Sequence, residues 1–187
     1  MSTGYKIADQ QGAYFLTLSV VNWVDVFTRQ TYRDIIIENL RYCQKNKGLV
    51  IYAYVIMSNH IHLLVQSLEE NLSGTIRDFK SYTSKTILEN INNVSESRKE
   101  WLLKHFEIAA KKHKRNSNYQ FWTHNNHPEI IYSDKFVKQK LEYIHNNPVK
   151  AGIVRNPEDY IYSSASNYAG LEYILEVEIL TTKWTTI

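Results

Sequence analysis

The spacing of hydrophobic and polar positions changes several times along the chain, and the order of these changes predicts the fold. The run YFLTLSVV (14–21) is rich in aromatic and β-branched residues, which is typical of a strand. Apolar side chains then recur at helical spacing behind Thr31, which predicts a helix from Tyr32 to Lys45, ending before Gly48.

Two extended segments follow with almost nothing between them. LVIYAYVIM (49–57) and HIHLLVQ (60–66) are separated only by Ser58 and Asn59. So short a polar connection favours an antiparallel hairpin. We expect this hairpin to form the central pair of the sheet.

The second half of the chain is predicted to be mostly helical. Residues 71–90 combine helical spacing of apolar positions with basic residues, and residues 98–115 form an amphipathic stretch that ends in KKHKR. YQFW (119–122) is a short strand candidate. Ser133 is placed to cap a last helix from Asp134 to about Asn146, and this helix should stop near Asn147 because Pro148 follows.

The resulting order, β-α-β-β-α-(α)-β-α, predicts an α+β fold of the ferredoxin-like type, a split βαβ antiparallel sheet with helices packed on it, as in RRM domains. At 187 residues the chain suits a single domain. We therefore expect one domain over 1–187, with residues 157–187 as a C-terminal appendage that is packed on the core or trails from it.

Composition and charge say little about the partner and the compartment of the protein. Hydrophobic residues make up 43% and charged residues 22%, an ordinary globular composition. The net charge of +3 suits a polyanionic partner without requiring one. Cys43 is the only cysteine, and neither a leader peptide nor a long apolar run is evident, so we expect a cytoplasmic protein without a membrane partner.

His60 and His62 are the first candidates for chemistry. Residues two apart on a strand point to the same face, so the two imidazoles converge while Ile61, Leu63 and Val65 point into a core. Paired imidazoles on a rigid strand can hold a divalent cation. The alternative is a hydrogen-bonded pair without a ligand, and spacing alone does not decide between the two.

Tyr143 and Asn147 are the second pair. At positions i and i+4 of a helix they share one face. Tyrosine can act as a covalent nucleophile toward phosphate, but a phenol with a pKa of about 10 needs a metal, base or positive charge nearby. Lys140 and His145 are local candidates for that help, whereas ordinary packing is the alternative for any one of 14 tyrosines.

These segments together resemble a known family. YVIMSNHIHLLVQ (54–66) is similar to the His-hydrophobic-His signature of the single-tyrosine HUH transposases, the insertion-sequence-200-like group. YIHNNPVKAGIV (143–154), PEDYIYSSA (157–165) and RDFKSYTSK (77–85) resemble the subgroup of REP-associated tyrosine transposases. The resemblance extends in order from about Tyr14 to Ala165.

The resemblance implies the HUH endonuclease fold and a reaction. His60, His62 and Asn147 would be metal ligands, for Mg²⁺ or Mn²⁺, and Tyr143 the nucleophile that cleaves and rejoins single-stranded DNA through a 5′-phosphotyrosine link. Hairpin-forming repeats would be the substrate. Whether the protein acts as a monomer or as a homodimer with shared sites stays open.

Contacts to DNA would come from basic side chains, which make binding dependent on salt. A solvated helix surface is the alternative for each. The candidates are Arg77, Lys80, Lys85, Lys111, Lys112, Lys114 and Arg115.

Four rival functions remain open at this stage. A non-catalytic nucleic-acid binder would have no need for two histidines, a tyrosine and an amide together. A replication initiator or relaxase commonly occurs in a longer chain. A small-molecule hydrolase would leave Tyr143 without a role. A domesticated relative would keep the site without moving DNA.

A histidine pair buried among apolar side chains, or a Tyr143 helix on the other face of the sheet, would argue against the site.

Overall fold

A computed structural model of the protein describes residues 6–93, 95–112 and 118–180. At its centre is a four-stranded sheet in the order β2-β3-β1-β4, in which all neighbours are antiparallel. The strands are β1 (Tyr14–Ser19), β2 (Leu49–Ile56), β3 (His60–Ser67) and β4 (Glu129–Ile130). The predicted hairpin is confirmed: β2 and β3 pair from Leu49 opposite Ser67 to Ile56 opposite Ile61.

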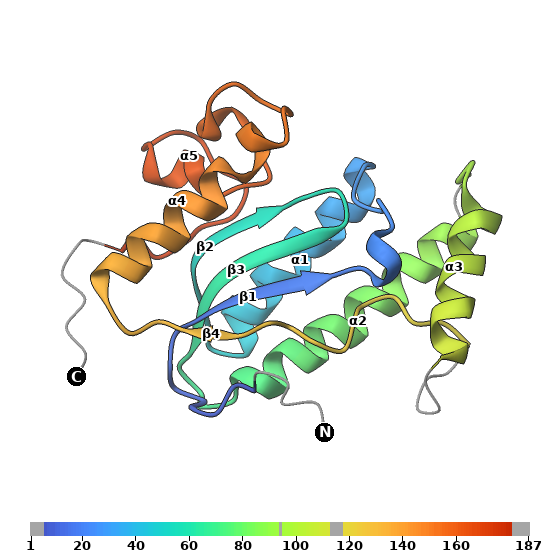
Figure 1. Cartoon of the computed structure of the whole chain (residues 1–187), viewed down its shortest axis with the longest axis horizontal. Helices are drawn as coiled ribbons and strands as arrows, with labels where there is room; N and C mark the ends of the chain where they lie inside the picture. The colour runs from blue at the N-terminus through green and yellow to red at the C-terminus, as the bar shows by residue number, and fades with distance from the viewer. Residues whose placement is uncertain (1–5, 94, 113–117, 181–187) are drawn as a thin grey trace.

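Helices cover both faces of this sheet. In Figure 1, α1 and α2 lie behind the strands, and α4 lies on the other side against β2 and β3. An α+β fold with an antiparallel sheet and packed helices is therefore confirmed. The helices are α1 (Gln30–Asn46), α2 (Leu72–Asn93), α3 (Lys99–Lys111), α4 (Asp134–Lys150) and α5 (Ala165–Tyr168), with short 3₁₀ turns η1 (Val21–Trp23) and η2 (Pro157–Asp159).

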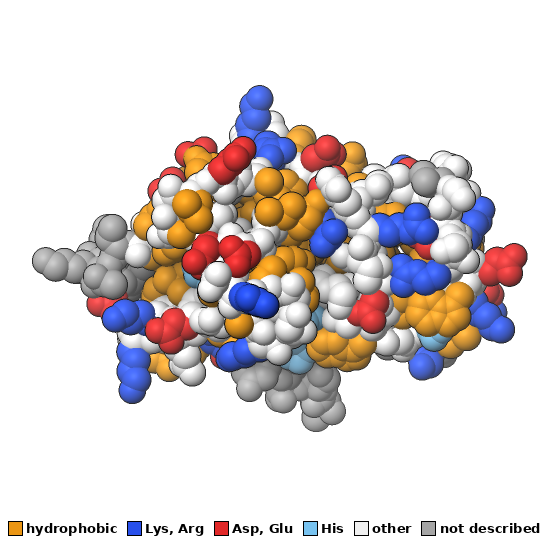
Figure 2. Space-filling model, turned by 90° about the horizontal axis from the view of Figure 1, so that it is seen from above, with side chains coloured by type: hydrophobic (Ala, Val, Ile, Leu, Met, Phe, Trp, Pro, Cys, Tyr) orange, Lys and Arg blue, Asp and Glu red, His pale blue; other side chains and the backbone are white. Residues whose placement is uncertain are grey.

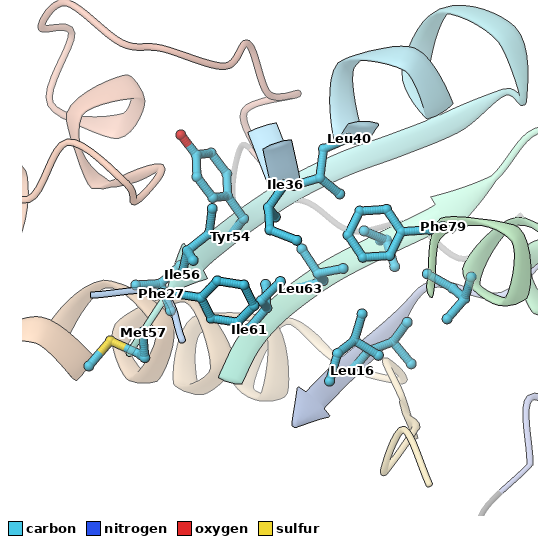
Figure 3. Close-up of a cluster of buried hydrophobic side chains, with 14 of the residues drawn as sticks. Leu16, Phe27, Ile36, Leu40, Tyr54, Ile56, Met57, Ile61, Leu63 and Phe79 are labelled. Carbon is cyan, nitrogen blue, oxygen red and sulfur yellow. The ribbon is translucent and has the colours of Figure 1, made fainter. Parts of the chain in front are cut away.

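The main core lies between the sheet and the layer of α1 and α2. Figure 3 shows Ile36 and Leu40 of α1 and Phe79 of α2 packed over Ile61 and Leu63 of β3. All five side chains are buried. Burial of such side chains contributes on the order of 1.5–3 kcal/mol each, which fixes the position of the strand that carries the two histidines. No helix among the described residues is long and apolar enough to span a membrane.

The fourth strand is not where the sequence predicted it. Trp122 forms only an isolated bridge with Val20, and the strand proper is Glu129–Ile130, opposite Tyr14 and Phe15. Between these two points the backbone turns, and the Asn125 side chain accepts a hydrogen bond from the His127 amide. This Asx-type turn interrupts the ladder, and the two residues that pair again are too few for a periodic pattern.

Helix α4 is longer than predicted, because Pro148 lies inside it. The proline removes one helical hydrogen bond, to the carbonyl of residue 144, without ending the helix. The end is set instead by Gly152, which has φ +70°, with hydrogen bonds from Gly152 N to Val149 O and from Ile153 N to Pro148 O. This is the Schellman pattern. In the first half of the chain, α1 begins at Gln30, so Thr31 lies in its first turn and is not its cap.

Residues 157–180 run along the outer edge of β2. Ile56 N donates to Tyr162 O at 3.0 Å, Ser164 N to Tyr54 O at 3.0 Å, and Glu178 N to Ile51 O at 2.9 Å. An open strand edge invites pairing with other chains, so these contacts protect β2.

Candidate active site

Alternation along β3 separates the two histidines from the core. Ile61, Leu63 and Val65 are fully buried on the side of α1 and α2. His60 and His62 lie on the other face, with ring centroids 4.7 Å apart. The strand therefore presents two imidazoles side by side, as its period of two requires.

His62 is buried and has one nitrogen atom without a partner. Its Nδ1 lies 3.0 Å from Thr17 Oγ1, on the paired position of β1. Its Nε2 is buried and has no hydrogen-bond partner among the described residues. Burial first, and then the charges of His60 and Lys140, lower the pKa of His62 to about 3, so the ring is neutral near pH 7.

His60 is oriented by the residue before it. Asn59 Nδ2 donates to Asp25 Oδ1 at 2.9 Å, which fixes the amide with its oxygen toward His60 Nδ1 at 2.7 Å. A carbonyl oxygen only accepts, so Nδ1 carries the proton and Nε2 has the lone pair. Burial also lowers the pKa of His60, against the opposing charge of Asp25.

Tyr143 of α4 lies against His62. Its ring centroid is 5.1 Å from that of His62 and 5.9 Å from that of Phe15. The residue is 41% exposed, so Tyr143 contacts the buried histidine and is also open to solvent. Lys150, two helical turns later, places Nζ 5.8 Å from the centre of the Tyr143 ring.

The two predicted helpers of Tyr143 both have other partners. Lys140 forms an ion pair with Glu129 at 2.7 Å and lies over the Phe15 ring. His145 Nε2 is 2.9 Å from Ser164 Oγ, on the side of the C-terminal segment. Asn147 is half-buried one turn beyond Tyr143 on α4.

Two of the criteria set by the sequence point in different directions. Helix α4 lies on the histidine face, as the site requires. His62, however, is only 4% exposed and stacks on Phe15 at 5.3 Å, which is the environment of a core histidine. Its unpaired Nε2 distinguishes it, because buried polar atoms are nearly always hydrogen-bonded. In the described part of the chain, no three His, Cys, Asp or Glu side chains gather closely enough to hold a metal, so a ligand set here needs an amide or water.

Comparison with known proteins decides the family. A family model described as "Transposase IS200 like" matches residues 10–147, most of the chain. The chain belongs to the IS200-like transposases. The matched range of this IS200-like transposase contains both histidines and Tyr143 and ends at Asn147. The resemblance to the insertion-sequence-200-like group is thereby confirmed.

A solved structure shows the same fold as this IS200-like transposase. It is described as "Structure of the REP associates tyrosine transposase bound to a REP hairpin". The TM-score is 0.62 at 19% identity, and the match covers 100% of this chain and 99% of that chain. A comparison with curated proteins gave no match.

The basic residues predicted to contact DNA are variously placed in this IS200-like transposase. Arg77, Lys85 and Lys111 pair with acidic neighbours on exposed helix surfaces. Lys80 instead donates to Thr123 O at 2.6 Å and to Asn126 Oδ1 at 2.7 Å, and burial lowers its pKa to about 8. Lys112 is exposed at the end of α3. Lys114 and Arg115 lie outside the described residues.

Charge is mixed on the face of the transposase seen in Figure 2. Lys and Arg side chains are interspersed with Asp and Glu, and apolar side chains are exposed between them. No single-sign surface dominates this view. Recognition of a polyanion over this face would therefore depend on individual contacts more than on the overall field.

Sequence reasoning missed four residues of this site. Thr17 and Asn59 hold the two imidazoles, Trp23 lies against His60, and Lys150 lies near the Tyr143 ring. Thr17 had a signal, since it is a polar residue between two leucines in the strand YFLTLS. Lys150 also had one, because it follows Tyr143 at helical spacing on the same face. The pattern predicts only a turn at Asn59, and nothing in sequence spacing links Trp23 to the hairpin.

Proposed function

We propose that this IS200-like transposase is a metal-dependent enzyme that cleaves and rejoins single-stranded DNA, with Tyr143 as nucleophile. The observation that carries the proposal is His62 Nε2, buried without a partner beside His60 and against Tyr143. A neutral imidazole nitrogen without a hydrogen bond is suited to a cation. A pair serving only to pack would bury this atom at a cost of about 1–3 kcal/mol.

The donor set fits a divalent metal. His60 Nδ1 faces the Asn59 oxygen and so carries the proton, which leaves a lone pair on His60 Nε2. In this proposal His62 Nδ1 donates to Thr17 Oγ1, which leaves a lone pair on His62 Nε2 as well. We assign Asn147 as the third ligand, with water completing the shell. Imidazole donors suit Mn²⁺, and an amide oxygen with waters suits Mg²⁺. When bound, the cation would polarise a phosphoryl oxygen of the scissile bond.

Tyr143 performs the covalent step in this proposal. The phenol loses its proton as Oη bonds to phosphorus, the bond from phosphorus to the 3′ oxygen breaks, and that oxygen takes up a proton. A 5′-phosphotyrosine and a free 3′-hydroxyl result. Attack by a 3′-hydroxyl of another strand reverses these changes, so joining needs no ATP. Lys150 supplies a positive charge near the phenol.

Hairpin-forming DNA is the proposed substrate. The REP-associated tyrosine transposase of similar fold is described as bound to a REP hairpin. The single cysteine, Cys43, is buried and free, which suits a reducing cytoplasm. We propose that the protein acts there, as a monomer or a homodimer, with residues 157–187 as an appendage of one domain.

The test is formation of a covalent protein–DNA adduct. Purified protein is incubated with labelled single-stranded hairpin DNAs, including the flanks of its own gene, and with Mn²⁺ or Mg²⁺, and the products are separated on a denaturing gel. We expect an adduct that needs metal and is lost in Tyr143→Phe. Tyr42→Phe is the matched control, because Tyr42 is an exposed helix tyrosine on α1, behind the other face of the sheet.

Three results would contradict the assignment in different ways. An adduct that persists in Tyr143→Phe places the nucleophile at another tyrosine. An adduct that still forms in EDTA shows that the reaction does not need a metal. If no hairpin gives an adduct, a DNA-binding or domesticated relative without strand cleavage replaces the proposal.

A further inference from the structure

Trp23 is an exposed aromatic residue beside the candidate active site. Its side chain is 62% exposed, an unusual environment for the largest apolar residue. Its ring centroid lies 5.6 Å from that of His60, at an interplanar angle of 72°, so the two rings do not stack on each other. The indole is therefore available for stacking with a planar partner from solvent.

The backbone at Trp23 is strained. Both Asn22 and Trp23 have φ +54°, in the left-handed region that L-residues avoid. For a bulky residue this conformation costs about 1–2 kcal/mol. Strain of this kind concentrates at functional sites, where the surrounding structure enforces it.

The hairpin that carries His60 also holds the turn of Trp23. Val20 N donates to Asn59 O at 2.9 Å, and Phe27 N donates to Ser58 O at 2.8 Å, on either side of the turn. Asn59 Nδ2 also approaches Trp23 O at 3.3 Å, while its Oδ1 accepts from His60. One side chain thus positions both the imidazole and the turn with the indole.

From these observations we propose that Trp23 is a stacking platform for an unpaired base of the DNA strand, next to the phosphate at His60 and His62. The proposal rests on the function proposed above and names a residue that positions the substrate. Bases of any sequence can stack on aromatic side chains. If a phosphate is held at His60, the base of an adjoining nucleotide lies close to the indole of Trp23, whose ring contacts His60.

Binding is the direct test, measured in a Tyr143→Phe background so that no strand is cut. The probe is a fluorescein-labelled DNA hairpin with single-stranded thymidine flanks, titrated with protein in the presence of Mn²⁺. We expect Trp23→Ala to weaken binding by roughly 5- to 150-fold, the range for loss of one stacked base. Trp23→Phe should retain most of the affinity.

Trp101→Ala is the matched control. Trp101 is 49% exposed and also lies against a histidine, His105, but it is on α3. Its removal should leave binding unchanged. A hairpin series lacking one thymine base at a time adds a double-mutant cycle. At one flank position, loss of the base should reproduce the effect of Trp23→Ala, and the two changes together should cost no more than either alone.

The possible outcomes distinguish the stacking role of Trp23 from the strand cleavage proposed above. Binding by Trp23→Ala equal to that by Trp101→Ala, or penalties that add at every flank position, overturns the platform. Coupling at one position together with no covalent adduct from any DNA leaves Trp23 as a base-binding residue and overturns the proposed chemistry. An adduct at Tyr143 without coupling overturns only the platform. Absence of binding to every hairpin overturns both.

Discussion

Each imidazole of the pair is held at its Nδ1 atom, and the two holders come from different places. Thr17 belongs to the neighbouring strand, and Asn59 to the connection of the hairpin. Such outer partners set which nitrogen is free and how the ring is turned. The geometry of a metal site at His60 and His62 therefore depends on two residues that would touch no metal themselves.

Thr17→Val tests this dependence while keeping the shape of the side chain. The variant removes the hydroxyl 3.0 Å from His62 Nδ1. We expect the Mn²⁺ concentration that gives half-maximal adduct to rise by about 10- to 100-fold, the usual effect of losing such a partner. Thr17→Ser, which keeps the hydroxyl, should behave as the wild type. Equal metal requirements in all three proteins would show that the contact has no such role.

Cys43 provides a test of burial through pH. Burial raises the pKa of its thiol to about 11. The unfolded chain therefore loses this proton at lower pH than the folded protein, and stability falls as pH rises from about 9 to about 11. Between pH 7 and pH 10, the free energy of unfolding should fall by about 1 kcal/mol more in the wild type than in Cys43→Ala. Urea unfolding of both proteins at the two pH values measures this difference. An equal fall in the wild type and in Cys43→Ala would contradict the burial of the thiol.

Sequence spacing predicted which residues of the candidate site share a face of one strand or one helix, but not which elements meet. His60 and His62 lie two apart on a strand, and Tyr143 and Asn147 one turn apart on a helix, so local geometry indicated each pair. That Tyr143 lies against His62 depends on how α4 crosses the sheet, for which the sequence offered only family resemblance. Lys140 looked close to Tyr143 along the chain, but Glu129 of β4 holds its ammonium group.

At the scale of elements, α4 shows why a proline is an incomplete stop signal. The prediction placed the end near Asn147 because a residue before proline disfavours helical backbone. Continuing costs one hydrogen bond, whereas the Schellman end at Gly152 forms two and carries Lys150 to the Tyr143 ring. The glycine was the stronger signal.

Gly152→Ala tests the role of this helix end. An added Cβ would meet no atom within 4 Å, so only the backbone conformation at φ +70° opposes it. We expect a loss of about 1 kcal/mol in the free energy of unfolding. Gly170→Ala is the matched control, since Gly170 has φ +68° and equally open surroundings after α5. Both variants should lose similar stability in urea, but only Gly152→Ala should also form less adduct. Equal adduct yields from Gly152→Ala and Gly170→Ala would show that the helix end does not affect the candidate site.

The rest of the fold could be predicted where a period was long enough to measure. Three strands and four helices were placed within a few residues, because their apolar positions repeat over several turns or pleats. Strand β4 has only two residues, so no period exists, and its pairing with Tyr14 depends on the distant turn at Asn125. The contacts of the C-terminal segment with β2 carry no periodic signal either.

At the scale of the whole molecule, one serine joins three parts of the structure. Ser164, in the C-terminal segment, is fully buried. Its Oγ accepts from Tyr54 N of β2 at 3.0 Å and lies 2.9 Å from His145 Nε2 of α4. Burial lowers the pKa of His145 to about 4, so this ring is neutral near pH 7 and its contact is an ordinary hydrogen bond. The edge of the sheet, the segment that covers it and the helix of Tyr143 are thus tied at one atom.

Ser164→Ala should therefore destabilise the whole protein, because it leaves the buried amide of Tyr54 and the half-buried ring of His145 without this partner. The expected loss is about 2–3 kcal/mol in the free energy of unfolding, measured in urea. Ser166→Ala, two positions along, is the control: Ser166 is also buried, but its Oγ has no hydrogen-bond partner among the described residues. Removing that hydroxyl should leave stability unchanged or raise it, since a buried polar atom without a partner is itself a cost. If the two variants were equally destabilised, loss of packing in the C-terminal segment would account for both, and Ser164 would not be the connection between the sheet and α4.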